Sequence, residues 1–394
     1  MRLLHVICTT SSESGGPIEA IYRISEVLLR NGLDITVVSL ESSEEVARRN
    51  FPFTHIALGG GFGKYRYNSQ LAPWLRKNAG CFDAVILHGI WNYASFGSWR
   101  ALRKLDIPYF VSIHGMMDPW FRDAYPVKHL AKQIYWFFIE GKVLRDATRT
   151  LFTCEEEMLR ARRVFRGHAY REQVVLYGTA VPPQDAETQC AIFHARFPSL
   201  NSKHFLLFLG RINPKKGCDL LIQAFAECLA DLPETTDLVF AGPDQIGWTR
   251  ELQGLAEELG IASRIHWVGM LSGDLKWGAI RLADALIIPS HQENFGFVVA
   301  EAMACGIPVL ISDKVNIWRE ILAAEAGLVE SDTEEGTVRL IRRFTSLSRE
   351  ELQRMRRNAE TGFRHFFDIE VTALDFARII ESYVSECGQA KLVK

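Results

Sequence analysis

Short apolar runs that alternate with helical patterns limit the possible folds of this chain more than any other feature. Runs that are apolar on both faces and separated by helices are typical of a parallel sheet with helices on each side. In the first half of the chain these runs lie at 3–7, 35–40, 84–87 and 109–112. We therefore expect an α/β layer there.

The same pattern returns in the second half. Pro182, Pro183 and a polar stretch interrupt it, and we place a linker at about 178–202. The apolar runs then resume at 205–209, 238–241, 265–268, 285–288 and 309–311. The second half is therefore expected to repeat the architecture of the first.

The length of the chain agrees with a division into domains. A chain of 394 residues exceeds what one hydrophobic core usually organises, so we expect two Rossmann-like α/β domains with a cleft between them. The tail carries Phe376, Ile379, Ile380 and Tyr383 at helical spacing and must dock its apolar stripe on another element. The expected boundaries are 1–185 and 200–365, with the terminal helix in 366–394.

The composition excludes some classes of function. Forty-five Lys and Arg residues against 47 Asp and Glu give a formal net charge of −2, which provides no overall field for nucleic acid. The eight cysteines form no CxxC pair and are interpreted as small core residues in a reducing compartment. No stretch approaches the roughly 20 apolar residues of a membrane span. We expect a cytoplasmic protein that could touch a membrane surface.

A basic turn follows the first strand of the second half. The run 205–217 reads FLLFLGRINPKKG, so that Arg211, Lys215 and Lys216 come after a buried strand. Ligands of open α/β sheets bind beyond the carboxyl ends of strands. A fixed guanidinium and a fixed ammonium there suit a diphosphate. A solvated basic loop is the alternative interpretation.

A second segment, 289–312, carries two glutamates. Phe297 to Ala304 is apolar nearly all round apart from Glu301, which predicts a buried helix with a carboxylate that needs a partner. A ribose diol would serve. Glu293 precedes the helix, where unpaired N–H groups and the helix dipole could read a phosphate or a sugar, although a plain capping carboxylate is the alternative.

Two further loops of the first half lie at carboxyl ends of expected strands. Gly15 and Gly16 open the first helix, but they form no GxGxxG, and Glu41 meets the acidic requirement of a dinucleotide site only loosely. His114 follows the strand 109–112, and His88 repeats the pattern. Either histidine could contact a sugar hydroxyl or could be a structural, hydrogen-bonded group.

The motifs GRINPKKG and Glu293-x7-Glu301, followed by GIPVLIS, resemble those of retaining glycosyltransferase family 4, whose two-domain fold is called GT-B. The resemblance covers nearly the whole chain. It implies that Arg211 and Lys216 grip the diphosphate of a nucleotide-sugar, that Glu301 binds its ribose, and that the terminal helix crosses back to the first domain. The other positions that it implies, for sugar, phosphate and base, are His114 and Glu293, Gly15 and Gly16, Asn294, Phe295, Gly296 and Phe297, and Val268, Gly269 and Met270.

The chain departs from the family pattern at two places. The segment 175–180 reads VLYGTA where many members have an Asn-Gly turn, and Met116 follows His114-Gly115 in place of an acidic residue. No Asp-x-Asp and no His/Cys cluster with metal-ligand spacing occurs, so we expect neither a metal nor another cofactor. The resemblance implies transfer with retention to a glycan or lipid-linked glycan acceptor, as in polysaccharide biosynthesis.

The segment 120–149 mixes Trp and Phe with Lys and Arg, a composition that could touch anionic lipid. A core helix is the favoured interpretation of this segment. Two other functions stay open: a nucleotide-sugar epimerase of the same fold, which would act on the donor alone, and a non-catalytic nucleotide-sugar binding protein.

Overall fold

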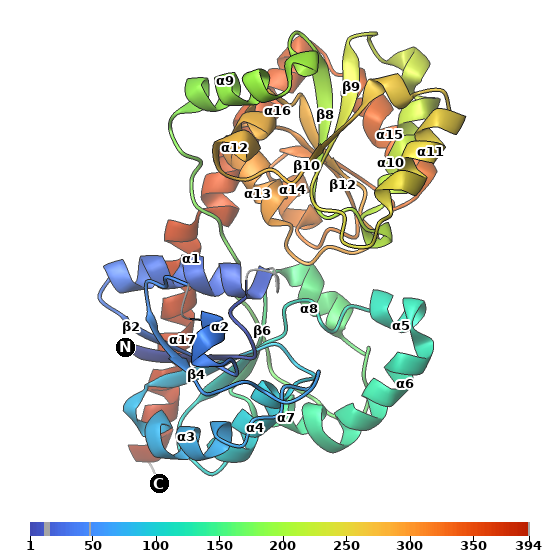
Figure 1. The fold of residues 1–394 in the computed structure, drawn as a ribbon. Coiled ribbons are helices and arrows are strands. Elements are labelled where there is room, and N and C mark those ends of the chain that lie inside the picture. The colour runs from blue at the N-terminus through green and yellow to red at the C-terminus, as the bar shows by residue number, and fades with distance from the viewer. Residues whose placement is uncertain (12–15, 47–48, 393–394) are drawn as a thin grey trace. The chain divides into compact units, whose positions relative to one another are not determined.

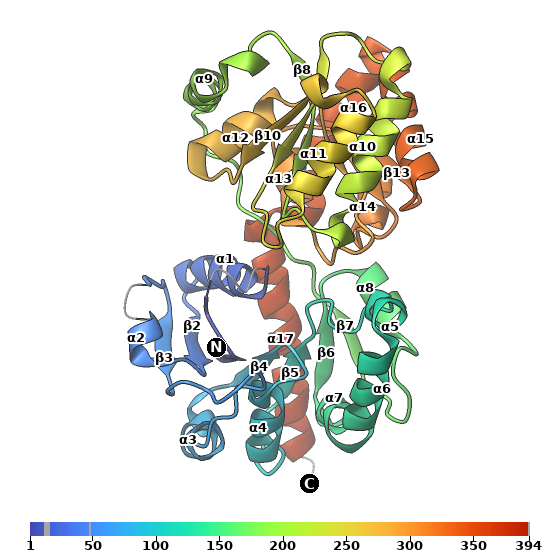
Figure 2. The same ribbon diagram turned by 45° about the vertical axis from the view of Figure 1, so that its right-hand side comes forward.

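The computed structural model describes residues 1–11, 16–46 and 49–392. The chain divides into two compact units, one formed by Met1–Gly178 with Ile369–Lys394 and the other by Thr179–Asp368. Both are α/β, as the apolar runs predict. Each has a parallel sheet with helices on its faces, as Figures 1 and 2 show.

The first unit contains a seven-stranded sheet of order β3-β2-β1-β4-β5-β6-β7. Its strands are β1 (Arg2–Ile7), β2 (Asp34–Ser39), β3 (Thr54–Ala57), β4 (Ala84–His88), β5 (Tyr109–Ser112), β6 (Arg149–Phe152) and β7 (Glu172–Val174). Its helices are α1 (Gly16–Arg30), α2 (Ser43–Val46), α3 (Leu71–Asn78), α4 (Tyr93–Leu102), α5 (Trp120–Ala124), α6 (Pro126–Tyr135), α7 (Gly141–Asp146), α8 (Glu155–Ala161) and α17 (Ile369–Leu392). The strand order reverses between β1 and β4, which is where such sheets bind ligands.

The second unit repeats this arrangement with a six-stranded sheet of order β10-β9-β8-β11-β12-β13. Its strands are β8 (His204–Leu209), β9 (Thr236–Ala241), β10 (Ile265–Gly269), β11 (Ala285–Ile288), β12 (Val309–Ser312) and β13 (Gly327–Glu330). Its helices are α9 (Ala186–Arg196), α10 (Cys218–Glu227), α11 (Thr249–Glu258), α12 (Gly273–Leu282), α13 (Phe297–Ala304), α14 (Trp318–Ala323), α15 (Glu334–Thr345) and α16 (Arg349–Gly362). Here the order reverses between β8 and β11.

The terminal helix α17 belongs to the first unit and packs along α1. The ring of Phe376 stacks on His5 of β1 with 6.5 Å between centroids, and the Tyr383 hydroxyl donates to Gln173 at 2.6 Å. The apolar stripe that the sequence shows in the tail therefore faces the sheet, and Figure 2 shows the helix running along it. At the N-terminal end of α17, Glu370 pairs with Arg30 of α1 at 2.6 Å.

The interruption at 178–202 is not only a linker, because it contains helix α9. Asp185 caps the helix by accepting from the Thr188 N–H at 3.3 Å, and Phe193 is fully buried. Gln189 joins α9 to α12 by accepting from the Arg281 guanidinium at 2.9 Å. Helix α9 was not predicted because its sequence is mostly polar and only a short face of it is buried.

The segment 120–149 also differs from expectation. Helix α6 buries none of its residues, so the core-helix interpretation is wrong for this part. The inward side chains come later, where Trp136 begins a π-helical turn, 136–140, and Val143 and Leu144 lie in α7. Among the described residues, no helix has both the length and the apolar character that a membrane crossing requires.

Candidate active site

The strand-order reversal of the second unit brings charged side chains together. A turn at Pro214–Lys216 follows β8, and Gly217 begins α10 with a left-handed φ of +66°. A side-chain carbon at Gly217 would lie 2.4 Å from the Pro289 carbonyl oxygen, so only glycine allows this approach. The turn is thereby pressed against the end of β11, and Lys216 is buried there.

Lys216 forms an ion pair with Glu293, the first glutamate of the second segment. Burial alone would raise the pKa of Glu293, but the Lys216 ammonium outweighs it and the pKa is lowered. The structure thus brings together two residues that the sequence assigned to the diphosphate and to the sugar. Arg211 is exposed and has no ion-pair partner in the described part of the chain.

The loop that carries Glu293 is fixed by main-chain bonds. Glu293 N–H donates to the Lys314 carbonyl at 3.0 Å, and the Glu293 carbonyl accepts from Asn316 N–H at 3.0 Å. The N-cap residue of helix α13 is Gly296, whose φ is +74° and which has no side chain to cap the helix. The Glu293 carboxylate accepts from Asn294 N–H at 3.1 Å, outside the first turn. The capping-carboxylate interpretation is therefore wrong.

Glu301 lies on α13 and is buried, as its apolar neighbours predict. Its carboxylate pairs with Lys276 of α12 at 2.9 Å. The inference that a buried glutamate needs a partner is confirmed, but the protein itself supplies one. A ribose at this position would have to share the carboxylate with Lys276. The sequence offered no signal for Lys276, because a lysine on an amphipathic helix is usually solvated.

The neighbouring positions divide into core and surface. Phe295 is buried, with its ring 4.9 Å from that of Phe297 and 5.6 Å from that of Phe367, so it can offer a donor only its main chain. Gly269 ends the edge strand β10 and has a φ of +72°. Met270 beside it is 73% exposed, and Val268 is half-buried. None of these three residues belongs to the buried core.

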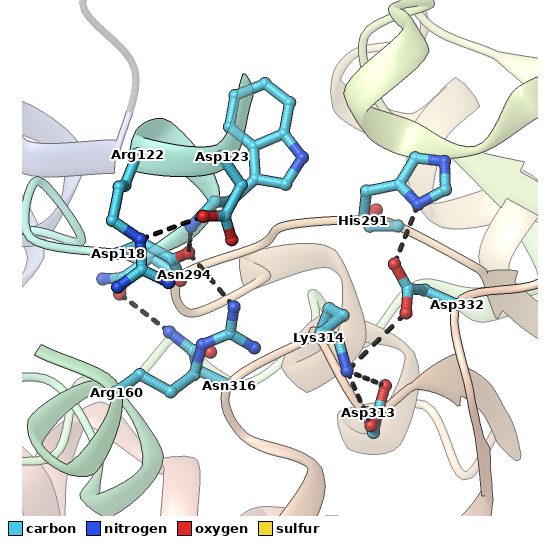
Figure 3. A network of polar contacts seen from close by, with 12 residues as sticks. Asp118, Arg122, Asp123, Arg160, His291, Asn294, Asp313, Lys314, Asn316 and Asp332 are labelled. Carbon is cyan, nitrogen blue, oxygen red and sulfur yellow. Dashed lines mark hydrogen bonds and ion pairs between the residues drawn. The ribbon is translucent and has the colours of Figure 1, made fainter. Parts of the chain in front are cut away.

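A network that was not predicted lies at the carboxyl ends of β11, β12 and β13 (Figure 3). His291 Nδ1 lies 2.9 Å from Asp332, and Lys314 contacts Asp332 at 3.6 Å and Asp313 at 2.8 Å. The hydrogen bond to Asp332 raises the pKa of His291 against the effect of burial. Because β13 did not stand out among the apolar runs, the position of Asp332 could not be inferred.

The glycine loop of the first unit is only partly described. Gly15 lies outside the described residues, and Gly16 is exposed at the start of α1. Glu41 is buried, and its carboxylate accepts from both the N–H and the hydroxyl of Thr10 at 2.7 Å and from Arg49 at 2.8 Å. These bonds overcome the effect of burial and lower the pKa of Glu41 to about 2. Glu41 is thus engaged within the unit, which agrees with rejecting a dinucleotide site.

Three histidines of the first unit form a stacked series across β1, β4 and the loop after β5, which we call the histidine chain. His5 Nδ1 lies 2.8 Å from His88 Nε2, and His88 Nδ1 lies 2.9 Å from His114 Nε2. The ring centroids are 5.1 and 5.2 Å apart. The Tyr177 hydroxyl lies 3.2 Å from His114 Nδ1 and 3.1 Å from the Ser112 hydroxyl.

The histidine chain leaves His114 little freedom. Both of its ring nitrogens are engaged within the unit, so a sugar hydroxyl could reach the ring only by replacing His88 or Tyr177. Burial lowers the pKa of His5 to about 4 and that of His114 to about 3. His114 also has a φ of +50°, which is strained for a residue with a side chain. These contacts support the interpretation of His88 as a structural histidine. The contact of His114 with a sugar stays a prediction.

Within residues 1–11, 16–46 and 49–392, no three His, Cys, Asp or Glu side chains are grouped so that they could hold a metal ion.

Comparison with known families gives two matches that together span most of the chain. Residues 192–362 match the family model for glycosyl transferases group 1. Residues 15–178 match the model for a glycosyl transferase 4-like domain. The two matched ranges lie in different units.

Curated relatives and solved structures agree with these matches. The chain is 42% identical to the D-inositol 3-phosphate glycosyltransferase of Geodermatophilus obscurus over 76% of this chain and 70% of that protein. It is 38% identical to the corresponding Rhodococcus jostii protein, over 64% of this chain and 56% of the relative. Sucrose-phosphate synthase of Thermosynechococcus elongatus shares the fold, with a TM-score of 0.76 at 18% identity over 98% and 99% of the two chains. Anabaena HepE, solved with UDP and glucose, gives a TM-score of 0.74 at 16% identity over 97% and 100%. The chain belongs to glycosyltransferase family 4 and has the GT-B fold.

Proposed function

We propose that this protein transfers a sugar from a nucleotide-sugar, a UDP- or GDP-sugar, to a glycan or lipid-linked glycan acceptor in polysaccharide biosynthesis. The observation that carries the proposal is the position of Lys216. It is buried at the strand-order reversal of the second unit and paired with Glu293, and the exposed guanidinium of Arg211 follows the same strand. This is where a parallel sheet binds nucleotides.

The donor diphosphate would compete with Glu293 for the Lys216 ammonium. A diphosphate carries more charge than one carboxylate, and Arg211 adds a planar fork that fits phosphate oxygens. Glu293, released from Lys216, would then accept hydrogen bonds from hydroxyl groups of the sugar. Glu301, shared with Lys276, would accept from the ribose.

The reaction would break the bond between the anomeric carbon and the phosphate oxygen and form a bond to the acceptor oxygen. Arg211, Lys216 and the N-terminus of α13 would stabilise the charge that develops on the leaving diphosphate. We infer retention, with the acceptor attacking from the leaving-group face and its proton passing to a phosphate oxygen. We also infer that no metal ion takes part.

The relatives support parts of this assignment. HepE has been solved with UDP-glucose, which favours a uridine nucleotide as donor. The D-inositol 3-phosphate glycosyltransferases are named for a phosphorylated acceptor. We place the acceptor on the first unit and the protein in the cytoplasm, with a peripheral membrane contact made by α6, whose exposed residues include Val127, Leu130 and Ile134.

A thermal-shift screen with UDP-, GDP- and ADP-sugars tests the donor assignment, because a ligand that binds only the folded state raises the unfolding temperature. We expect one nucleotide class to stabilise the wild type and to have little effect on Lys216→Ala. Incubating that donor without acceptor separates transfer from epimerisation, since an epimerase would isomerise the donor alone. Equal shifts for wild type and Lys216→Ala would refute the proposed site.

A further inference from the structure

Helix α6 and the turn after it present an apolar face to solvent. Val127, Leu130, Ile134, Phe137 and Phe138 are all more than half exposed, and Val127 reaches 82%. Their spacing places them along one side of the helix. A face of this size on a soluble unit usually marks a binding surface.

The same segment is free of negative charge. Residues 124–139 contain no Asp or Glu, whereas Lys128 and Lys132 lie within them. The Lys132 ammonium lies over the rings of Trp91 and Phe121, at 4.8 and 5.8 Å from their centroids. It has no carboxylate partner among the residues that the structure describes. Positive charge beside an apolar helix face matches the surface of an anionic membrane.

A cavity of about 530 Å³ opens beside this face. It is lined by Arg122, His129, Gln133, Phe137, Arg163, Val164, Arg166 and Gly167. Three guanidinium groups therefore line it, and no acidic side chain does. Arg122 pairs with the exposed Asp123 at 2.9 Å, whereas Arg163 and Arg166 have no ion pair in the described ranges. The lining suits an anion that has several acceptor oxygens.

The wall of the cavity is held in place by contacts between α6 and the loop at 163–167. The Gln133 side chain donates to the Arg166 carbonyl and accepts from Arg166 N–H, both at 3.0 Å. His129 stacks on Phe165 at 4.8 Å. Burial, together with Arg122 and Lys132, lowers the pKa of His129, which indicates a positive local potential.

A second cavity, of about 290 Å³, extends this site inward. It shares His129 and Val164 with the first cavity and also contacts Met116 and Asp118. These two residues follow His114 and Gly115 in the loop after β5. Asp118 is not free to repel an anion, because Arg160 pairs with it at 3.1 Å (Figure 3). The residues that line the two cavities therefore extend from the apolar face to the loop after β5 in the first unit.

We propose that the arginine-lined cavity binds the phosphate of a membrane lipid phosphate that carries the acceptor, with the apolar face of α6 among the acyl chains. The guanidinium groups neutralise the phosphate, and the inner cavity leads the attached acceptor group toward the loop after β5. This inference rests on the proposed function and narrows its acceptor to a lipid linked through phosphate. It also commits the exposed face to a membrane.

Vesicle flotation tests the proposal with the full-length protein. We compare phosphatidylcholine vesicles alone with vesicles containing phosphatidylglycerol, farnesyl phosphate or uncharged farnesol. We expect binding to rise about tenfold or more with either anionic lipid and not with farnesol. Equal binding to farnesyl phosphate and farnesol vesicles would overturn the proposal, as would full displacement by millimolar inorganic phosphate at constant ionic strength, which would identify free phosphate as the ligand.

Variants separate the cavity from general surface charge. Arg163→Gln with Arg166→Gln should lower binding to farnesyl phosphate vesicles about tenfold. Arg100→Gln with Lys104→Gln removes two charges from exposed positions elsewhere on the same unit and should lower it less than threefold. Leu130→Ser with Ile134→Ser should abolish flotation without unfolding the exposed helix. If both charge pairs lower binding equally, the cavity is not a phosphate site.

The donor screen keeps this proposal separate from the proposed function. Each variant should retain the nucleotide-sugar thermal shift of the wild type, which also shows that it is folded. In the wild type, a nucleotide-sugar shift without selective binding to farnesyl phosphate vesicles would refute the lipid site alone. Selective lipid binding without any nucleotide-sugar shift would refute the proposed function.

Discussion

The places where the strand order reverses are built from different kinds of polar groups in the two units. In the second unit this place carries ion pairs, and Lys216, which pairs with Glu293, is the most buried cation among them. In the first unit the equivalent place, between β1 and β4, is occupied by the histidine chain, whose members burial keeps neutral. The strand-order reversal therefore holds a buried ion pair in one unit and neutral, hydrogen-bonded imidazoles in the other.

The difference follows from what each arrangement can exchange. A carboxylate that pairs with a buried lysine can give way to a phosphate, because the lysine keeps an anionic partner throughout. Neutral imidazoles cannot stabilise an anion in this way. They can hold a loop and its hydroxyl-binding groups in one geometry, which suits an uncharged sugar.

The largest expected effect is that of Lys216→Ala. Removing the ammonium leaves Glu293 without its ion-pair partner and the diphosphate without its buried cation, so transfer should fall about 100-fold. Steady-state release of nucleotide in the presence of acceptor measures it. Lys215→Ala, on the same turn but less buried, is the control and should cost less than threefold. Wild-type turnover in Lys216→Ala would show that transfer does not need the buried cation.

A smaller effect should separate the two partners of Glu301. Glu301→Ala removes a proposed ribose acceptor and also strands Lys276, so the KM for the donor should rise about tenfold and stability should fall. Lys276→Met removes only the ion pair and should lower stability with little change in KM. Donor titrations and thermal unfolding of both variants measure this. Identical KM values for the two variants would mean that Glu301 is purely structural.

Mild acid should weaken the first unit before the second. Near pH 6.5 the unfolded chain takes up protons at His5, His88 and His114. In the folded unit burial lowers the pKa of His5 to about 4 and that of His114 to about 3, and it lowers the pKa of His88 well below its ordinary value. Their stabilisation is therefore complete above pH 6.5 and is lost as the pH falls toward 4. Glu140 opposes this, since burial raises its pKa to about 7, but one carboxyl offsets only one of the three histidines. The net loss is about 1–3 kcal/mol per pH unit.

The second unit has no such trend over the same range. The pKa of His291 is raised by its bond to Asp332, so its contribution is complete below pH 6.5 and is lost only at higher pH. Hydrogen exchange at pH 7 and pH 5.5, corrected for intrinsic rates, should show peptides of β1, β4 and β5 losing protection while those of β8, β11 and β12 keep it. Equal losses would contradict the neutral state of the histidine chain.

The fold could be predicted because the features that indicate it are local in the chain. Apolar runs mark buried strands, and the repeat of the pattern marks the second sheet. A lone carboxylate in the apolar helix around Glu301 marked a buried group that needs a partner. Helix α9 could not be predicted because its buried face consists of little more than Phe193 and Gln189.

The partners of the site residues depend on long-range contacts, which the sequence does not encode locally. Lys276 reaches Glu301 only because α12 packs beside α13, and His5 reaches His88 only because β1 and β4 are neighbours in the sheet. His5 lies inside an apolar strand and looks like an ordinary core residue. Strand order, rather than any motif, brings the histidine chain together.

A chelator should have the smallest effect, because we expect it to leave the transfer rate unchanged. If Arg211, Lys216 and the N-terminus of α13 carry the charge of the leaving diphosphate, then transfer should be unchanged by EDTA and by added Mg²⁺ or Mn²⁺. The measurement is the transfer rate of the wild type and of Lys216→Ala under each condition. Rescue of Lys216→Ala by a divalent ion would sharpen the comparison, because it would show that the second unit supplies positive charge and little else at this position. A wild-type rate that falls in EDTA and recovers with Mg²⁺ would instead show that the fixed cations are not sufficient for the diphosphate.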